Sequence, residues 1–169
     1  MTLRKKIKAI IKYLTYDPVK FWNDLGGEQY YKQFHSSNAR NEDVFFQAIG
    51  KYQPKTIIDI GCGYGRYLKA INEVYPKIQL FGVDIAESQI NQAKTFLDDC
   101  KNISLSVTNN NKLPFGDHFF DMTITYGCFS AVKKRDLNHF FSEMTRVTKN
   151  VGVFIENLPE KDWNIFYDN

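Results

Sequence analysis

The sequence has few cysteines and no long apolar run, and these absences exclude several classes of protein. Its three cysteines, Cys62, Cys100 and Cys128, lie far apart and form no Cys-x-x-Cys pair, so neither a zinc site nor a disulfide framework is predicted. Reduced thiols fit a cytoplasmic protein. No segment reaches the length of a membrane-spanning helix, and lysines interrupt the apolar residues near the N-terminus, which disfavours a secretory signal. We therefore expect a cytoplasmic protein without a metal site.

The chain also lacks a strong net charge of either sign. Its 22 Lys and Arg against 19 Asp and Glu give a formal net charge of +3 over 169 residues. Because basic residues without acidic neighbours crowd the first twelve positions, the rest of the chain is slightly acidic and shows no footprint typical of nucleic-acid binding. Residues 1–16 are predicted to form a basic amphipathic helix. Residues 3–14 could lie on an acidic membrane surface, but packing on the same domain or on a partner subunit is the favoured interpretation.

A glycine-rich turn follows a short apolar strand near position 60. The segment 56–68 reads Thr-Ile-Ile-Asp-Ile-Gly-Cys-Gly-Tyr-Gly-Arg-Tyr-Leu, which predicts a strand buried on both faces, a turn and the start of a helix. Glycines lack a Cβ, so a nucleotide-type ligand can closely approach backbone N–H groups and a helix N-terminus. Arg66 stands where the dinucleotide fingerprint has its third glycine, and no P-loop Gly-Lys-Ser/Thr follows. Nicotinamide is therefore disfavoured, and a P-loop is excluded.

A second apolar strand ends in an acidic residue. Gln-Leu-Phe-Gly-Val-Asp over residues 79–84 places Asp84 at about the separation expected of a βαβ unit whose carboxylate binds ribose hydroxyls. An ionised carboxylate can accept both hydrogens of a ribose diol. The alternative is that Asp84 only caps the helix that starts near Ala86. The glycine turn upstream favours ribose binding.

The residues Asp-Ile-Gly-Cys-Gly-Tyr-Gly at positions 59–65 resemble motif I of the class I S-adenosylmethionine-dependent methyltransferases. Two later segments resemble the same family in the same order. Residues 109–115 resemble its segment that ends in Leu-Pro-Phe, with Asn109 where Asp is usual, and residues 144–152 resemble its Arg-Val-Leu-Lys-Pro-Gly-Gly stretch, with Asn-Val replacing Pro-Gly. The resemblance covers about residues 17–156.

The resemblance implies a doubly wound, three-layer Rossmann-like α/β fold with a mainly parallel sheet of about five strands. N-terminal helices precede this sheet, and Asp17-Pro18 predicts the start of one of them, with Asp17 as its cap. Residues 17–169 are expected to form a single cofactor-binding domain. Residues 158–169 look too short for the final helix and two antiparallel strands that usually complete the family's sheet. An exposed fifth strand would invite pairing, so a homodimer is a further expectation.

The resemblance also implies S-adenosylmethionine as the cofactor. Asp84 would bind its ribose, Ile85 and Asn109 its adenine, and Tyr126 would face its methionine half. Aromatic residues before motif I would help to line a substrate pocket. The predicted cofactor-binding residues are Asp59, Gly61, Cys62, Gly63, Gly65, Asp84, Ile85, Asn109, Asn110 and Tyr126, and the predicted pocket residues are Tyr30, Tyr31 and His35.

The predicted activity is methyl transfer to a small-molecule acceptor. Because the sulfonium already activates the methyl group, the protein must mainly hold the acceptor in line and exclude water. A hydroxyl or ammonium acceptor would also need a general base, and none of His35, His118 and His139 is assigned that role. One alternative is a cofactor-binding or regulatory module without activity that acts with a partner. A nicotinamide-dependent oxidoreductase is the second alternative, which the glycine spacing disfavours.

Overall fold

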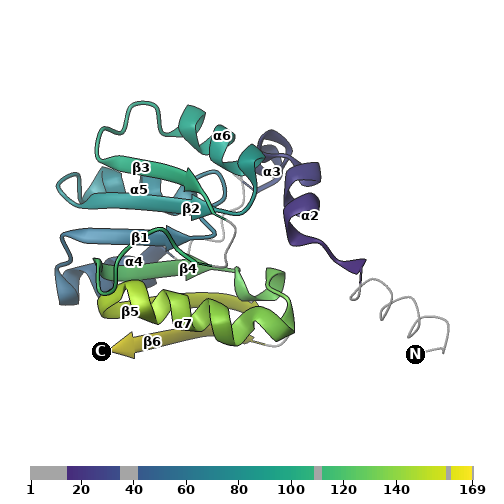
Figure 1. The fold of residues 1–169 in the computed structure, drawn as a ribbon. Coiled ribbons are helices and arrows are strands. Elements are labelled where there is room, and N and C mark those ends of the chain that lie inside the picture. Colours follow the sequence, from purple (N-terminus) through teal and green to yellow (C-terminus); the bar gives the residue numbers. More distant parts are fainter. Residues whose placement is uncertain (1–14, 35–41, 109–111, 159–160, 169) are drawn as a thin grey trace.

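The computed structural model describes residues 15–34, 42–108, 112–158 and 161–168. In this part of the chain a six-stranded sheet with the order β3-β2-β1-β4-β5-β6 separates two layers of helices (Figure 1). The strands are β1 (Thr56–Ile60), β2 (Gln79–Asp84), β3 (Ile103–Val107), β4 (Phe120–Tyr126), β5 (Thr148–Leu158) and β6 (Lys161–Asp168). The α-helices are α2 (Pro18–Leu25), α3 (Gly27–Phe34), α4 (Glu42–Tyr52), α5 (Arg66–Val74), α6 (Glu87–Phe96) and α7 (Leu137–Val147).

The first five strands are parallel, which confirms the predicted fold class. Strand β1 lies in the middle, paired with β2 on one side and β4 on the other. Because successive side chains of a strand point to opposite faces, Ile57 and Ile58 enter two different clusters of buried residues. Strand β1 is therefore buried on both faces, as its mostly apolar sequence predicts.

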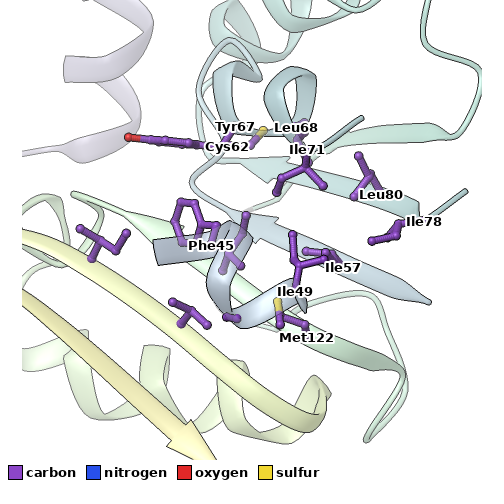
Figure 2. Close-up of a cluster of buried hydrophobic side chains, with 14 of the residues drawn as sticks. Phe45, Ile49, Ile57, Cys62, Tyr67, Leu68, Ile71, Ile78, Leu80 and Met122 are labelled. Carbon is purple, nitrogen blue, oxygen red and sulfur yellow. The ribbon is translucent and has the colours of Figure 1, made fainter. Parts of the chain in front are cut away.

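Helices α4, α5 and α6 cover one face of the sheet, and α7 covers the other (Figure 1). Figure 2 shows the larger cluster, in which Phe45 and Ile49 of α4 lie near Ile57 of β1. Its members share full or nearly full burial, and apolar burial of this kind stabilises a domain by about 25 cal/mol per Å². The two covered faces fix the strands, and with them the turns at the strands' carboxyl ends.

The sheet carries one strand more than predicted. Residues 161–168 form β6, which pairs antiparallel with β5 from Val151 opposite Asp168 to Leu158 opposite Lys161. The expectation that the sheet stops at its fifth strand was therefore wrong, because a hairpin needs only a short connection between antiparallel strands. Strand β6 covers the edge of β5, so the argument from that edge for a homodimer no longer applies.

Helix α2 begins where the sequence predicts. Asp17 caps α2, and its side chain accepts a hydrogen bond from Lys20 N. The next helix, α3, packs against α6. The predicted basic helix at residues 1–16 lies outside the described residues except for its last two positions. None of the helices within the described ranges has the length and hydropathy needed to cross a membrane.

Candidate cofactor site

A cavity of about 360 Å³ lies at the carboxyl ends of β1, β2 and β4. Helices α2 and α3 stand beyond these strand ends (Figure 1), and α2, α3, α6 and the start of α7 contribute to the cavity wall. Ligands of open parallel sheets bind in this location, where strand order reverses about a central strand. Five of the predicted cofactor residues line the cavity: Gly61, Gly63, Asp84, Ile85 and Tyr126.

The glycine turn lies between β1 and α5. Gly61 has a φ of +77°, and its N–H donates to Val83 O at 2.8 Å, which ties the turn to β2. A Cβ on Gly61 would lie 2.7 Å from Cys128 Sγ, so no larger residue fits there without a shift. At Gly65 a Cβ would lie 2.5 Å from Leu97 Cδ1. The turn is thus held in place by β2, and its outer glycines are also constrained by packing.

Asp84 joins the glycine turn to the start of α6. Its Oδ2 accepts a hydrogen bond from Gly63 N at 2.9 Å, and its Oδ1 accepts one from Ala86 N at 2.9 Å. The residue is only 8 % exposed, and this burial raises the pKa of the carboxyl while the N–H donors lower it. Helix α6 begins at Glu87 with Ala86 as its N-cap and has no side-chain cap. The structure therefore does not support the alternative that Asp84 is only the helix cap.

Asp59 lies behind the cavity and does not line it. It is 2 % exposed, and its Oδ2 has no hydrogen-bond partner among the described residues. Burial and the neighbouring charge of Asp84 raise the pKa of Asp59 to about 8. A carboxyl of this kind favours the neutral form in isolation, and a cation bound nearby would favour the ionised form.

Gln89 of α6 is a site residue that the sequence reasoning missed. It is 1 % exposed, it lines the cavity, and neither its Nε2 nor its Oε1 has a hydrogen-bond partner among the described residues. A Cβ on Gly63 would lie 3.8 Å from Gln89 Oε1, so the amide is close to the glycine turn. Unsatisfied buried amides are rare and suggest a ligand. A polar residue next to Ile90 on the inward face of α6 was the available signal.

The aromatic residues before β1 divide between the cavity and the protein interior. Tyr30 lines the cavity, and its pKa is raised first by burial and then by the charge of Asp84. Trp22, which was not predicted, also lines the cavity and lies edge-on to Tyr30 with ring centroids 5.6 Å apart. Tyr31 does not line it; its ring lies 5.1 Å from that of Tyr64. Its ring also lies 5.5 Å from that of Phe96 in α6, so we place Tyr31 in the packing of α3 against the glycine turn and α6. Predicted His35 lies outside the described residues.

Tyr126 and Cys128 close the cavity at the end of β4. The Tyr126 ring lies 5.0 Å from that of Tyr67, which fixes its orientation. Cys128 is half-buried, and desolvation together with Asp84 and Glu156 raises the pKa of its thiol. Because the thiolate is the reactive form of cysteine, Cys128 is not a nucleophile in this state. The predicted residue Cys62 belongs to the core cluster (Figure 2), and burial also raises its pKa.

Another part of the cavity wall comes from α2, from the connection between β4 and α7, and from the start of α7. Its apolar part is formed by Pro18, Val19, Trp22, Ala131, Val132 and Phe140. Its polar part is formed by Lys133, Asp136 and His139. His139, to which no general-base role was assigned from the sequence, is exposed in the first turn of α7 and lines the cavity. His118 lies elsewhere, with its Nδ1 2.9 Å from Thr148 O.

A second cavity of about 490 Å³ is more open and adjoins the first. Val19 and Ile85 line both cavities. The remaining wall of the second cavity consists of Val107, Thr108, Lys112 and Pro114. Predicted Asn109 and Asn110 fall between these positions in the sequence and lie outside the described residues.

A sequence model of the methyltransferase domain family matches residues 57–152, more than half of the chain. The chain belongs to the methyltransferase domain family. It is 46% identical over 48 residues to a malonyl-[acyl-carrier protein] O-methyltransferase of Anoxybacillus flavithermus, covering 28% of this chain and 18% of the relative. A protein of the same name from Geobacter sulfurreducens is 28% identical over 102 residues, covering 60% of this chain and 38% of the relative.

Solved structures support the fold assignment. A SAM-dependent methyltransferase from Aquifex aeolicus superposes with a TM-score of 0.60 at 22% identity, covering 87% of this chain and 78% of that one. At this identity the likeness concerns the fold alone. The chain spans less than half the length of either curated relative. The cofactor implied by this methyltransferase family is S-adenosylmethionine.

Proposed function

We propose that this protein binds S-adenosylmethionine in the described cavity and transfers its methyl group to a small-molecule acceptor. The observation that carries the proposal is the position of Asp84. Two backbone N–H groups hold its carboxylate at the cavity wall. Each carboxylate oxygen can accept more than one hydrogen bond, so capacity remains for the hydroxyls of a ribose. The predicted roles of Gly61, Gly63, Ile85, Tyr126 and Tyr30, which also line the cavity, are part of this proposal.

The residues present fit this cofactor. Gln89 carries a donor and an acceptor that have no partner among the described residues, and it lies beside the turn that Asp84 holds. Ile85 would contact the adenine, because it follows Asp84 and lines both cavities. The carboxylate of Asp84 favours a positively charged ligand, and such a ligand would in turn favour the ionised form of Asp59. Bound S-adenosylmethionine would supply a methyl group already activated by its sulfonium.

The acceptor would occupy the part of the cavity between α2 and the start of α7. Its walls are largely apolar, with Lys133, Asp136 and His139 as polar side chains. These residues would hold the acceptor in line with the methyl group and exclude water, which accounts for much of the catalysis that a methyl transfer needs. By their names, the malonyl-[acyl-carrier protein] O-methyltransferase relatives act on an oxygen of an acyl group carried by a protein, which supports an oxygen acceptor without identifying it.

Calorimetric titration with S-adenosylmethionine and S-adenosylhomocysteine tests cofactor binding. We expect saturable binding by the wild type and, in Asp84→Asn, a loss of about 10- to 100-fold, because hydrogen bonds to charged groups contribute about 1.5–3 kcal/mol. Asp98→Asn is the matched control, since Asp98 is exposed near the end of α6 and lines neither cavity. Thermal unfolding of each variant separates lost affinity from lost fold. Absence of wild-type binding would contradict the proposal.

Transfer of a labelled methyl group to a panel of carboxylate, hydroxyl and amine acceptors tests turnover. Binding without transfer to any acceptor would instead favour the alternative of a regulatory module that acts with a partner. A cytoplasmic location and a homodimer remain predictions. Light scattering at micromolar concentration tests the dimer, and a monomer would contradict it.

A further inference from the structure

A pair of charged residues on α7 forms a network of hydrogen bonds apart from the glycine turn. Arg146 Nε donates to Glu143 Oε1 at 2.7 Å, and Arg146 Nη2 donates to Glu143 Oε2 at 2.8 Å. The two residues are three positions apart and therefore lie on one face of the helix. A two-bond contact between guanidinium and carboxylate fixes geometry as well as contributing energy.

This Glu143–Arg146 pair holds the backbone of the segment before β4. Glu143 Oε2 accepts a hydrogen bond from Leu113 N at 2.8 Å, and Arg146 Nη2 donates to Leu113 O at 3.1 Å. Arg146 Nη1 donates to Phe115 O at 2.8 Å and to Asp117 Oδ1 at 2.9 Å. Both polar backbone atoms of Leu113 are thus bound by one ion pair from a distant helix.

Both residues of the pair stay charged near neutral pH. The side chains of Arg146 and Glu143 are 21% and 10% exposed. The hydrogen bonds from Arg146 have the largest effect on the pKa of Glu143 and lower it. Burial raises this pKa, and the hydrogen bond from Leu113 N lowers it, so that the pKa of Glu143 is about 2. The pKa of Arg146 is raised, first by Glu143 and then by Asp117. Protonation therefore does not release the segment near neutral pH.

The segment held in this way forms one wall of the second cavity. Leu113 is buried, while its neighbours Lys112 and Pro114 line the cavity together with Ile85. Phe115 continues the segment and packs against Phe120 with ring centroids 4.8 Å apart. The pair itself lines neither cavity, so any effect on a ligand must act through the wall.

We propose that Glu143 and Arg146 are positioning residues for the adenine of the cofactor. This inference rests on the proposed function. It places the ribose at Asp84 and the purine in the second cavity, where Ile85 also forms part of the wall. A planar ring held between Ile85 and the segment 112–114 needs a wall at a fixed distance, because an error of about 1 Å weakens such a contact markedly. The pair sets that distance from the far side of the segment.

The test compares two ligands that differ only in the purine. S-adenosylhomocysteine and S-inosylhomocysteine are titrated calorimetrically into the wild type, Arg146→Lys and Glu143→Gln. Lysine keeps the charge of Arg146 but lacks its fork of donors, and glutamine lacks the second acceptor oxygen. We expect the wild type to prefer the adenine ligand and both variants to lose about tenfold in that preference, which corresponds to about 1.4 kcal/mol. A merely structural role would leave the ratio of the two affinities unchanged.

Asp99→Asn is the matched control. It removes an ion pair in which Lys69 Nζ lies 2.6 Å from Asp99 Oδ1, and neither residue lines a cavity. Glu143→Asp, which keeps the charge and shortens the side chain, serves if the stronger variants unfold, and it is expected to give a smaller loss of preference. An unchanged affinity ratio in folded variants overturns this inference alone. A wild type that binds neither ligand overturns the proposed function and this inference with it.

Discussion

Substitution of Gly27 by alanine tests whether α2 and α3 form the wall of the cofactor cavity. Gly27 is the first residue of α3 and is buried against α6. A Cβ there would lie 2.2 Å from Ser88 O and 2.6 Å from Gln92 Cβ. The first atom belongs to the backbone, so no change of rotamer relieves the overlap. Gly27 is not among the residues with positive φ, and the expected effect is therefore steric.

The overlap would push α2 and α3 away from α6. Asn23 Oδ1 accepts a hydrogen bond from Ser88 N at 3.1 Å, and Ser88 Oγ donates to Trp22 O at 3.4 Å. Helix α2 contains no buried residue, so this segment yields before the core does. Loss of both bonds removes about 2 kcal/mol at about 1 kcal/mol each, and the displaced Trp22 and Tyr30 no longer close the cavity.

We therefore expect Gly27→Ala to bind S-adenosylhomocysteine about 30-fold more weakly than the wild type in calorimetric titration. Gly50→Ala is the matched control, because Gly50 lies in α4 and a Cβ there meets nothing within 4 Å. Alanine at that position should raise the free energy of unfolding by up to about 1 kcal/mol without changing affinity. Wild-type affinity in Gly27→Ala would refute the assignment of α2 and α3 to the cavity wall.

Two further substitutions should change stability: Gln89→Leu should raise it, and Asp59→Asn should change its dependence on pH. Gln89→Leu removes buried polar atoms that have no partner in the part of the chain that the structure describes. We expect urea unfolding to show a gain of about 1 kcal/mol while affinity for S-adenosylhomocysteine falls, and a loss of stability would contradict this. Burial raises the pKa of Asp59 to about 8. Between about pH 6 and 8 Asp59 therefore keeps its proton in the folded state but has lost it in the unfolded state. Wild-type stability should then fall by up to about 1.4 kcal/mol for each pH unit in this range. Asp59→Asn should flatten that slope, and identical slopes would exclude Asp59 as its cause.

The predictable parts of the fold were those coded by short segments. Strand β1 and its turn were visible because three isoleucines and one aspartate end at three alternating glycines. Asp84 was visible because its strand ends in the only acidic residue of that run. Strand β6 was missed because its existence depends on pairing with β5, which no local pattern specifies. Its residues Lys-Asp-Trp-Asn-Ile-Phe-Tyr-Asp alternate only in part, and strand propensity depends strongly on such context.

The same distinction applies to the site. Gly61, Gly63 and Asp84 could be placed near a ligand because strand ends of a parallel sheet meet at one edge. Gln89 needed the knowledge that its face of α6 turns toward Gly63. The Glu143–Arg146 pair needed the long-range contact between α7 and Leu113. Side-chain roles that depend on a partner far away in the sequence are not encoded in the spacing of a motif.

The glycine turn shows why spacing alone can still identify a ligand class. A dinucleotide fingerprint uses its third glycine for close packing of helix and strand, and in this chain that glycine comes one residue early, with Arg66 after it. Gly65 nevertheless has a packing role, because a Cβ there would meet Leu97, the C-cap residue of α6, at 2.5 Å. Gly61 and Gly63 both line the cavity, and the N–H of Gly63 also holds Asp84. The third glycine of this turn therefore serves packing, while the first two leave the backbone open to a ligand.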